Sequence, residues 1–201
     1  MSLRDRKRAR TRQALVDAAT ELFRRQGYDR TTVADIAAAA EIGTRTFFSY
    51  FASKEELLFP ESDTRVQAVI AAIDSRAPGE GPAEVLLRAL SAVPDTGDDL
   101  VGPLAALRLD LIRTVPAVRG RALQIQLDAQ QEIARRLAEA FADRIDLVRA
   151  AALTGAFVGA VTGALQVLLD DPEHLAAPGD LHAAVRAATD AALAPWLRPG
   201  I

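Results

Sequence analysis

Residues 43–56 have the sequence GTRTFFSYFASKEE, which concentrates side chains able to recognise a partner. The stretch places Phe47, Phe48, Tyr50 and Phe51 within five positions, although the whole chain has only 7 Phe, 2 Tyr and 1 Trp. A short helix of this kind either fills a small core or presents rings to a partner. Phe47 and Phe51 are four residues apart and share one helix face, so we expect both to be buried. Phe48 and Tyr50 lie off that face, and we expect them to be exposed.

The basic residues are concentrated near the amino end. Residues 1–54 contain 11 Lys and Arg against 6 Asp and Glu, a net charge of +5, whereas residues 55–201 contain 13 against 21, a net charge of −8. Six cations form a basic arm at the start of the chain: Arg4, Arg6, Lys7, Arg8, Arg10 and Arg12. A small basic segment joined to a larger acidic one indicates that only the basic segment meets a polyanion.

The composition excludes several classes of enzyme. The chain has no cysteine, which removes thiol catalysis, disulfide frameworks and cysteine zinc sites and fits a reducing cytosol. Its two histidines, His174 and His182, lack a metal-binding spacing, and there is no Gly-rich phosphate loop. No apolar run follows the basic amino end, so we expect no signal peptide. We therefore predict no enzymatic activity, no cofactor, no metal site and a cytoplasmic location.

The elements that must position these side chains are all expected to be helices. Ala, Leu, Arg and Glu dominate the sequence, and no stretch alternates convincingly with period two, so we predict an all-α fold. Pro- and Gly-rich segments separate the helical stretches and predict nine helices. We expect them near residues 5–26, 33–40, 44–51, 54–76, 83–93, 99–114, 117–142, 145–169 and 180–197.

Local signals mark several of these helix ends. Thr32 followed by Asp35 predicts a capping box at the start of the second helix. Ser53 and Glu56 predict another, in which Ser53 accepts from the Glu56 amide and Glu56 reaches back, so that the fourth helix starts at the next residue. Pro60 removes an N–H and crowds the preceding turn, so this helix should kink near residues 56–60 or restart after them.

The second and third helices have the lengths of a helix-turn-helix, in which the first helix supports the second against the DNA major groove. Residues 13–59, and especially TTVADIAAAAEIGTRTFFSYFASKEELL, resemble the tetracycline-repressor (TetR) family of transcriptional regulators. The Thr-rich helix start, the Ala-rich run, the aromatic third helix and the following Ser-Lys-Glu align without gaps. The rest of the chain is similar only as an all-helical C-terminal domain of suitable length.

The resemblance implies that residues 1–53 are a helix-turn-helix DNA-binding domain and residues 54–201 an effector-binding and dimerisation domain. It implies base reading by Thr44, Arg45 and Phe48, and backbone anchoring by Thr32, Thr46, Tyr50 and Lys54. Arg45 can donate two hydrogen bonds to guanine, Thr44 can meet a base edge, and Phe48 offers an apolar contact to a thymine methyl group. Helix N-termini, where Thr32 and Lys54 are expected, favour phosphate.

Three positions depart from the family pattern. Phe48 stands where tyrosine is commonest and cannot hydrogen-bond a phosphate, which shifts its expected role towards thymine recognition. Gly43 replaces the usual serine cap and is expected to be a tolerated N-cap. Glu41 stands where the family usually has glycine, and we expect from it a less strained turn than usual.

Three glycines repeat every four residues along the helix expected at 145–169: Gly155, Gly159 and Gly163. They form a groove that another helix can approach closely, either within one subunit or across a dimer. Operators with dyad symmetry need dimers whose recognition helices lie about 34 Å apart. The resemblance implies that this helix and the helix at 180–197 form a four-helix bundle between two subunits. The flat Gly/Ala surface, with Leu193 and Trp196 nearby, suits an apolar contact. We predict a homodimer.

The resemblance also implies an effector cavity in the C-terminal domain. The candidate lining residues are Leu104, Arg108, Leu111, Thr154, Thr162 and Gln166. The polar members interrupt apolar helices, so they could offer polar contacts to a mainly hydrophobic small-molecule effector. The alternatives are a snorkelling or salt-bridged arginine and threonines bonded to their own helix backbone.

The segment Ala150–Leu169 has no charge over twenty residues, about the length that spans a bilayer. However, it is rich in Ala and Gly, contains three polar residues and lacks an aromatic belt. We therefore expect a helix buried between protein surfaces, and no membrane anchor.

These features together predict a ligand-responsive transcriptional regulator. By the family's usual mode it is a repressor that binds palindromic double-stranded DNA as a homodimer and is released by a small hydrophobic effector. The alternative is a helical small-molecule carrier or scaffold that does not bind DNA.

Overall fold

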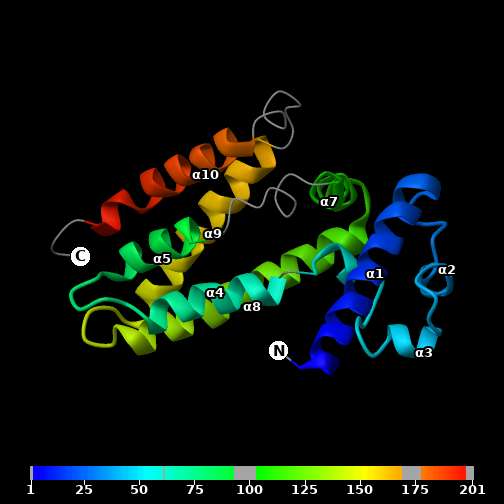
Figure 1. Cartoon of the computed structure of the whole chain (residues 1–201). Coiled ribbons are helices and arrows are strands. Elements are labelled where there is room, and N and C mark those ends of the chain that lie inside the picture. Colours follow the sequence, from blue (N-terminus) through cyan, green and yellow to red (C-terminus); the bar gives the residue numbers. More distant parts are fainter. Residues whose placement is uncertain (1, 61, 93–102, 169–177, 198–201) are drawn as a thin grey trace. The chain divides into compact units, whose positions relative to one another are not determined.

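The computed structural model of the chain (Figure 1) describes residues 2–60, 62–92, 103–168 and 178–197. Within these residues all regular structure is helical, with nine α-helices and two 3-10 helices. The all-α prediction is thus confirmed, and the nine predicted helices correspond in order to the nine observed ones. Three predicted helix bounds, residues 93, 99 and 169, and also His174, lie outside the described residues.

The chain divides into two compact units, which are described separately. The first unit comprises Met1–Pro60 and Gly102–Ala122, and the second comprises Glu61–Val101 and Leu123–Ile201. The division falls inside α8, whose first turn carries Val118 into the core of the first unit. The predicted boundary after residue 53 separates a DNA-binding domain from an effector-binding and dimerisation domain, and it stays a prediction.

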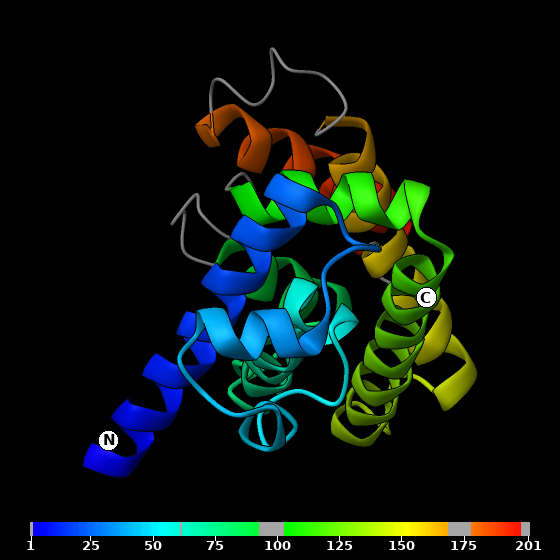
Figure 2. The same cartoon turned by 90° about the vertical axis from the view of Figure 1, so that its right-hand side faces the viewer.

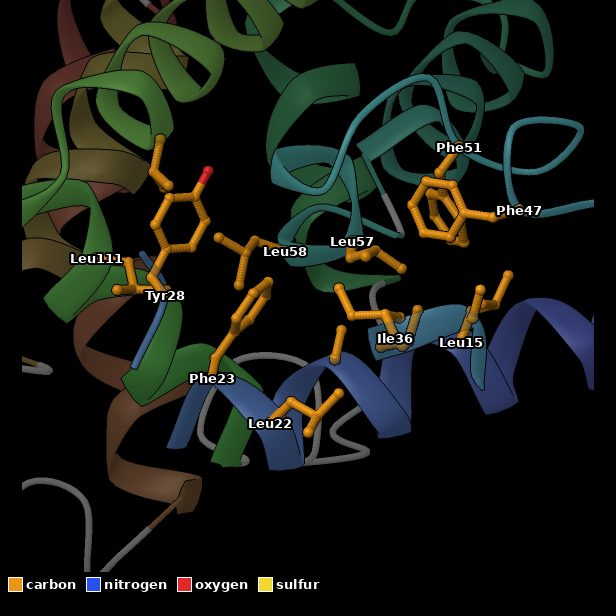
Figure 3. Packing of buried hydrophobic residues seen from close by; sticks show 14 residues of the cluster. Leu15, Leu22, Phe23, Tyr28, Ile36, Phe47, Phe51, Leu57, Leu58 and Leu111 are labelled. Atoms are coloured by element: carbon orange, nitrogen blue, oxygen red, sulfur yellow. The ribbon is translucent and has the colours of Figure 1, made fainter. Parts of the chain in front are cut away.

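The first unit contains α1 (Leu3–Gln26), α2 (Val33–Ala39), α3 (Thr44–Phe47), the 3-10 helix η1 (Glu55–Leu58), α7 (Pro103–Thr114) and the start of α8 (Pro116–Ala140). Apolar residues at helical spacing on α1 form the base of its core. The residues labelled in Figure 3 are Leu15, Leu22, Phe23, Tyr28, Ile36, Phe47, Phe51, Leu57, Leu58 and Leu111. Phe47 is 0 % exposed and Phe51 is 2 % exposed, which confirms that these two rings are core.

The second unit contains α4 (Ser62–Asp74), α5 (Pro82–Ser91), most of α8, α9 (Leu147–Leu168), α10 (Pro178–Leu193) and the 3-10 helix η3 (Ala194–Leu197). α10 packs along α9, and α5 packs on both α4 and α10. The inward face of α10 carries Leu181, Val185 and Leu193 at spacings of four and eight residues. Leu193 is fully buried on this face, so it offers no exposed apolar surface to a second subunit.

The turn between α2 and α3 contains a left-handed residue. Ile42 N donates to Ala37 O at 2.9 Å, and Glu41 N donates to Ala38 O at 3.1 Å. This pair of hydrogen bonds is the Schellman motif, which places the first residue beyond the helix cap at positive φ. Glu41 has a φ of 56°, in the region that favours glycine. The expectation of a less strained turn is therefore wrong, because the motif holds the glutamate in the conformation that a glycine would adopt freely.

α3 is shorter than predicted. The α-helix ends at Phe47, and residues 48–50 continue as hydrogen-bonded turns. Tyr50 N donates to Phe47 O at 2.9 Å, a spacing of three residues that tightens the chain beyond the helix. Gly43 is the N-cap of α3, as predicted, and it provides no side-chain cap.

The capping box predicted for Ser53 and Glu56 is wrong. The helix that follows α3 is the 3-10 helix η1, with Lys54 at its N-cap and no side-chain cap. Glu56 reaches back further than predicted, and its Oε2 accepts from Ala52 N at 2.8 Å. The Ser53 side chain instead hydrogen-bonds the Glu55 carboxylate.

Pro60 separates η1 from α4. η1 ends at Leu58 and α4 begins at Ser62, so the restart, one of the two outcomes predicted for this proline, is confirmed. The carbonyl of Pro60 accepts from Arg12 Nη2 at 3.1 Å, which ties this end of the first unit to α1.

α9 is the one helix in the described part of the chain that is long and apolar enough to cross a membrane, with 22 residues and a mean hydropathy of 1.6. One side of it packs into the second unit's core through Ala150, Leu153 and Phe157. Val148 and Val167 are 79 % and 71 % exposed. Among the described residues of one chain, α9 is therefore packed on one side only.

Candidate nucleic-acid interface

The outward face of α3 is uncovered within the described residues. Thr44, Arg45 and Thr46 are exposed, and Phe48, just beyond the helix, is 57 % exposed. The buried ring of Phe47 meets the Phe48 ring edge to face, at a centroid separation of 5.3 Å. One side of this segment therefore anchors it in the core. The other side offers a guanidinium, two hydroxyls and an aromatic ring to solvent.

The helix that supports α3 is capped as predicted. Thr32 Oγ1 accepts from Asp35 N at 3.1 Å, and Asp35 Oδ2 accepts from Thr32 N at 2.9 Å. The Thr32 hydroxyl also donates to the same carboxylate oxygen at 2.7 Å. The hydrogen bonds from the Thr32 side chain and backbone hold the pKa of Asp35 below its ordinary value. The reciprocal bonds fix where α2 begins.

Lys54 is held within the first unit by hydrogen bonds and a ring contact. Its Nζ donates to Tyr28 O at 2.9 Å and to Thr31 O at 3.1 Å. The ammonium also lies 3.9 Å from the centroid of the Tyr28 ring, a cation–π contact. Because an ammonium has three N–H donors, these bonds leave one for an external acceptor such as a phosphate.

Tyr28 completes the Lys54 site from the other side. It is 6 % exposed, and its hydroxyl donates to the Glu55 carboxylate. Burial, followed by the hydrogen bond to Glu55 and the negative charge there, raises the pKa of Tyr28 far above its ordinary value. Burial also raises the pKa of Glu55, but hydrogen bonds from Ser53 and Tyr28 outweigh it and lower the pKa overall. Sequence reasoning missed Tyr28, whose only local signal is its place after the helix-ending Gly27.

Two arginines of α1 hold the chain just beyond α3. Arg8 Nη2 donates to Ser49 O at 3.4 Å, and its guanidinium carbon lies 5.2 Å from the Tyr50 ring centroid. Arg12 Nη1 donates to Tyr50 O at 3.1 Å, and its guanidinium carbon lies 4.2 Å from the Phe51 ring centroid. Tyr50, expected to be exposed, is half-buried beside these cations.

Helices that follow much later in the sequence hold η1. Arg121 Nη2 on α8 donates to Glu56 Oε1 at 2.7 Å, across 65 positions. Because the other oxygen of Glu56 accepts from the Ala52 amide, one carboxylate links the segment after α3 to α8. Arg108 Nη1 on α7 donates to Leu58 O at 3.3 Å. No sequence signal indicates these pairings.

The six candidate effector residues are divided between the two units. Leu104, Arg108 and Leu111 belong to the first unit, where Leu111 is buried in the core. Thr154, Thr162 and Gln166 lie on α9 in the second unit, and Gln166 is exposed. The Thr162 hydroxyl donates to Val158 O at 2.7 Å, whereas the fully buried Thr154 hydroxyl has no hydrogen-bond partner within the described residues.

The glycine stripe of α9 has free space above it. A Cβ placed on Gly155, Gly159 or Gly163 would meet no atom within 4 Å in the described chain, apart from the helix's own neighbouring backbone. Packing against another element of the same described chain therefore does not explain these glycines. Trp196 is half-buried and packs against the second unit's core.

Comparisons with known proteins agree with this geometry. Residues 15–59 match the family described as bacterial regulatory proteins, tetR family. The HTH-type transcriptional regulator TcmR of Streptomyces glaucescens is 36 % identical over 207 aligned positions, covering 98 % of this chain and 91 % of that protein. A solved complex of SmeT with triclosan has a TM-score of 0.62 at 20 % identity, covering 94 % of this chain and 93 % of SmeT. The repressor FadR of Thermus thermophilus, solved with lauroyl-CoA, has a TM-score of 0.50 at 21 % identity, covering 94 % and 97 %. The chain therefore belongs to the TetR family of bacterial regulatory proteins.

Proposed function

We propose that this protein is a ligand-responsive transcriptional repressor that binds a palindromic operator as a homodimer and leaves it when a small hydrophobic effector binds. The observation that carries the proposal is the outward face of α3. Its exposed Thr44, Arg45 and Phe48 are held from behind by the buried Phe47 and Phe51. A short helix anchored in this way can enter a major groove without unfolding its own core.

Each outward side chain has a role that its chemistry permits. Arg45 donates two hydrogen bonds to guanine O6 and N7, Thr44 meets a base edge, and Phe48 packs on a thymine methyl group. Four further residues anchor the sugar-phosphate backbone: Thr32, Thr46, Tyr50 and Lys54. Support for the Lys54 role is the one N–H donor that it does not use within the described residues.

Binding to DNA is tested by fluorescence anisotropy on duplexes from the region upstream of the protein's own gene. A protein that neutralises phosphates loses affinity steeply as salt rises, so the measurement is made at 50 and 200 mM salt. We expect salt-dependent binding with a preference for one duplex over scrambled DNA. Binding that is equally weak for all sequences would contradict the proposal.

The homodimer is proposed to form through α9 and α10. The open glycine stripe and the exposed side of α9 support this surface, because a second α9 can approach closely only where side chains are absent. The same surface would cover the apolar side of α9 without a membrane, which agrees with a cytoplasmic regulator. Gly159→Glu should yield monomers in light scattering, while Ala68→Glu, at an exposed position of α4 in the same unit, serves as the control. An unchanged dimer in Gly159→Glu would contradict this surface.

The effector site is proposed to include Thr154. A buried hydroxyl without a hydrogen-bond partner costs roughly 1–3 kcal/mol, and a ligand that supplies the partner regains it. The solved complexes of SmeT and FadR support a small-molecule effector for this fold. Gln166, on the same helix, is a further proposed contact.

Thr162 offers a matched control for Thr154, because its hydroxyl is already bonded to its own helix. A compound is first selected from a panel of apolar molecules by its effect on the melting temperature. Thr154→Val should then blunt the loss of operator affinity that this compound causes, whereas Thr162→Val should leave it nearly unchanged. Equal responses of both variants would remove Thr154 from the site.

A further inference from the structure

The first turns of α1 carry charge but form no core. No side chain from Leu3 to Ala14 is buried, and six of these twelve residues are Lys or Arg. The helix is nevertheless formed from its first turn, since Ser2 and Asp5 make a reciprocal capping box. Asp5, the one acid in this segment, is thus bonded locally. The first turns of α1, Leu3 to Ala14, are therefore an ordered helix that carries cations.

The contacts to the chain beyond α3 define which side of these first turns of α1 faces α3. Arg8 and Arg12 are four residues apart, and both touch the backbone beyond α3. Arg4 lies one turn before Arg8 on the same side. Arg6 and Arg10 are also four apart, but at 100° per residue they lie about 160° around the helix from Arg4 and Arg8.

The first turns of α1 and α3 lie at the same end of the first unit. In both views the amino end of α1 and α3 are at the lower end of this unit (Figures 1 and 2). Arg4, Arg6 and Lys7 are exposed, and within the described residues none of them forms an ion pair or a side-chain hydrogen bond. Their charges are therefore available to a polyanion that approaches α3.

We infer that the Arg4 and Arg8 side of α1 is a second DNA-contacting surface, which binds phosphates flanking the bases that α3 reads. Arg4 lies eight residues before Arg12, about 12 Å along the helix axis. Laid along a duplex at about 3.4 Å per base pair, this length corresponds to about 3–4 base pairs beyond the bases that α3 reads. The inference rests on the proposed DNA binding and adds a surface outside the helix-turn-helix.

The side chains on this surface suit phosphate rather than base contacts. Arg8 already spends one donor on Ser49 O and stacks on Tyr50, so its remaining N–H groups are held at a defined place. Tyr50 is itself a proposed backbone contact, so the stacked pair would bring a hydroxyl and a guanidinium to neighbouring phosphates. Phosphate contacts of this type add affinity and register without adding sequence preference.

The test compares Arg4→Gln with Arg6→Gln. Both remove one exposed arginine from the same turns of the same helix, and neither side chain has a partner within the described residues. The DNA is a duplex selected by the wild-type protein from a randomised pool. It is made in two lengths, one ending at the selected bases and one extended by 5 base pairs at each end. Affinities are measured between 50 and 200 mM salt, and circular dichroism verifies that both variants keep the wild-type helix content.

We expect Arg4→Gln to reduce the salt slope on the long duplex by about 0.9 per subunit. Between 50 and 200 mM salt, the variant should therefore lose about threefold less affinity per subunit than the wild type loses. The short duplex should show no difference between wild type and Arg4→Gln. Arg6→Gln should change the slope on the long duplex by less than half as much.

Equal effects of the two variants on the salt slope would overturn the inference. They would show that the positive charge of α1 acts at a distance, and that no one side of the helix contacts phosphates. An Arg4→Gln effect that is the same on both duplex lengths would also overturn it. A wild-type protein that selects no duplex would remove the proposed function and this inference together. If the wild type binds with sequence preference, the comparison of Arg4→Gln with Arg6→Gln tests only the role of α1 and leaves the proposed DNA binding in place.

Discussion

Replacing Glu41 by glycine should stabilise the protein, although it deletes a side chain. Glu41 has a φ of 56°, and left-handed backbone costs an ordinary L-residue about 1–2 kcal/mol. Glycine avoids this strain but loses about 0.5–1 kcal/mol through the greater freedom of the unfolded chain. The difference predicts a net stabilisation of about 0.5–1 kcal/mol. The side chain of Glu41 makes no hydrogen bond or ion pair within the described residues, so no contact is lost.

The assay is thermal unfolding followed by circular dichroism at a fixed protein concentration. For a chain of this size, 1 kcal/mol shifts the melting temperature by about 2–4 °C, so Glu41→Gly should melt about 1–4 °C higher. Glu41→Ala is the matched control, because it removes the charge but keeps a Cβ at the strained position. We expect no comparable gain from it.

Two results would refute this reasoning. If Glu41→Ala stabilises as much as Glu41→Gly, the penalty comes from the carboxylate and not from the backbone. If Glu41→Gly lowers the melting temperature, the Schellman turn is held by contacts that compensate the strain. The turn bonds from residues 41 and 42 do not need a side chain, so neither result is expected.

The remaining predictions concern the interface. Arg45→Ala should weaken DNA binding and relax the preference at one base pair by about 1–3 kcal/mol, whereas Lys54→Ala should weaken binding to all sequences alike. Competition with a series of base-substituted duplexes measures both effects. Equal loss of sequence preference in the two variants would contradict the role assignment. Glu56→Gln should lower stability in urea unfolding by about 1 kcal/mol, because it weakens a half-exposed ion pair, and an unchanged midpoint would show that the pair does not hold η1. Thr32→Ala should destabilise the protein by about 1 kcal/mol through loss of the N-cap, and an unchanged urea midpoint would contradict this. In the same variant the pKa of Asp35 should return towards its ordinary value in an NMR titration. Because the folded pKa of Asp35 is depressed, its contribution to stability is present above the unfolded pKa and is lost as the pH falls through the folded pKa, so a pKa unmoved by Thr32→Ala would contradict this linkage.

Local chemistry in the sequence determined most helix bounds. The capping box at Thr32, the glycine cap at Gly43 and the restart after Pro60 all depend on atoms within about four residues of one another, so a single sequence suffices to predict them. The buried pair Phe47 and Phe51 follows from helical periodicity in the same way. The resemblance then assigned these elements to a family, which the full-length similarity to TcmR confirms.

Predictions were wrong where a nearby signal competed with a distant partner. The carboxylate of Glu56 has the spacing of a capping box, but it is shared between the Ala52 amide and Arg121, which lies 65 positions away. The apolar character of Leu193 does not tell whether it faces the core or a second subunit, and the register of α10 places it in the core. Neither outcome is encoded within one turn of helix.

The sequence by itself determined that one side of α3 is apolar and the other offers hydrogen-bond donors, because the period of a helix is written in the order of its residues. Only the tertiary structure decided what holds the chain just beyond that helix: Arg8 and Arg12 from α1 donate to the carbonyls of Ser49 and Tyr50. The physical reason is that periodicity defines the faces of each helix separately. Which faces meet depends on how the folded chain brings distant segments together.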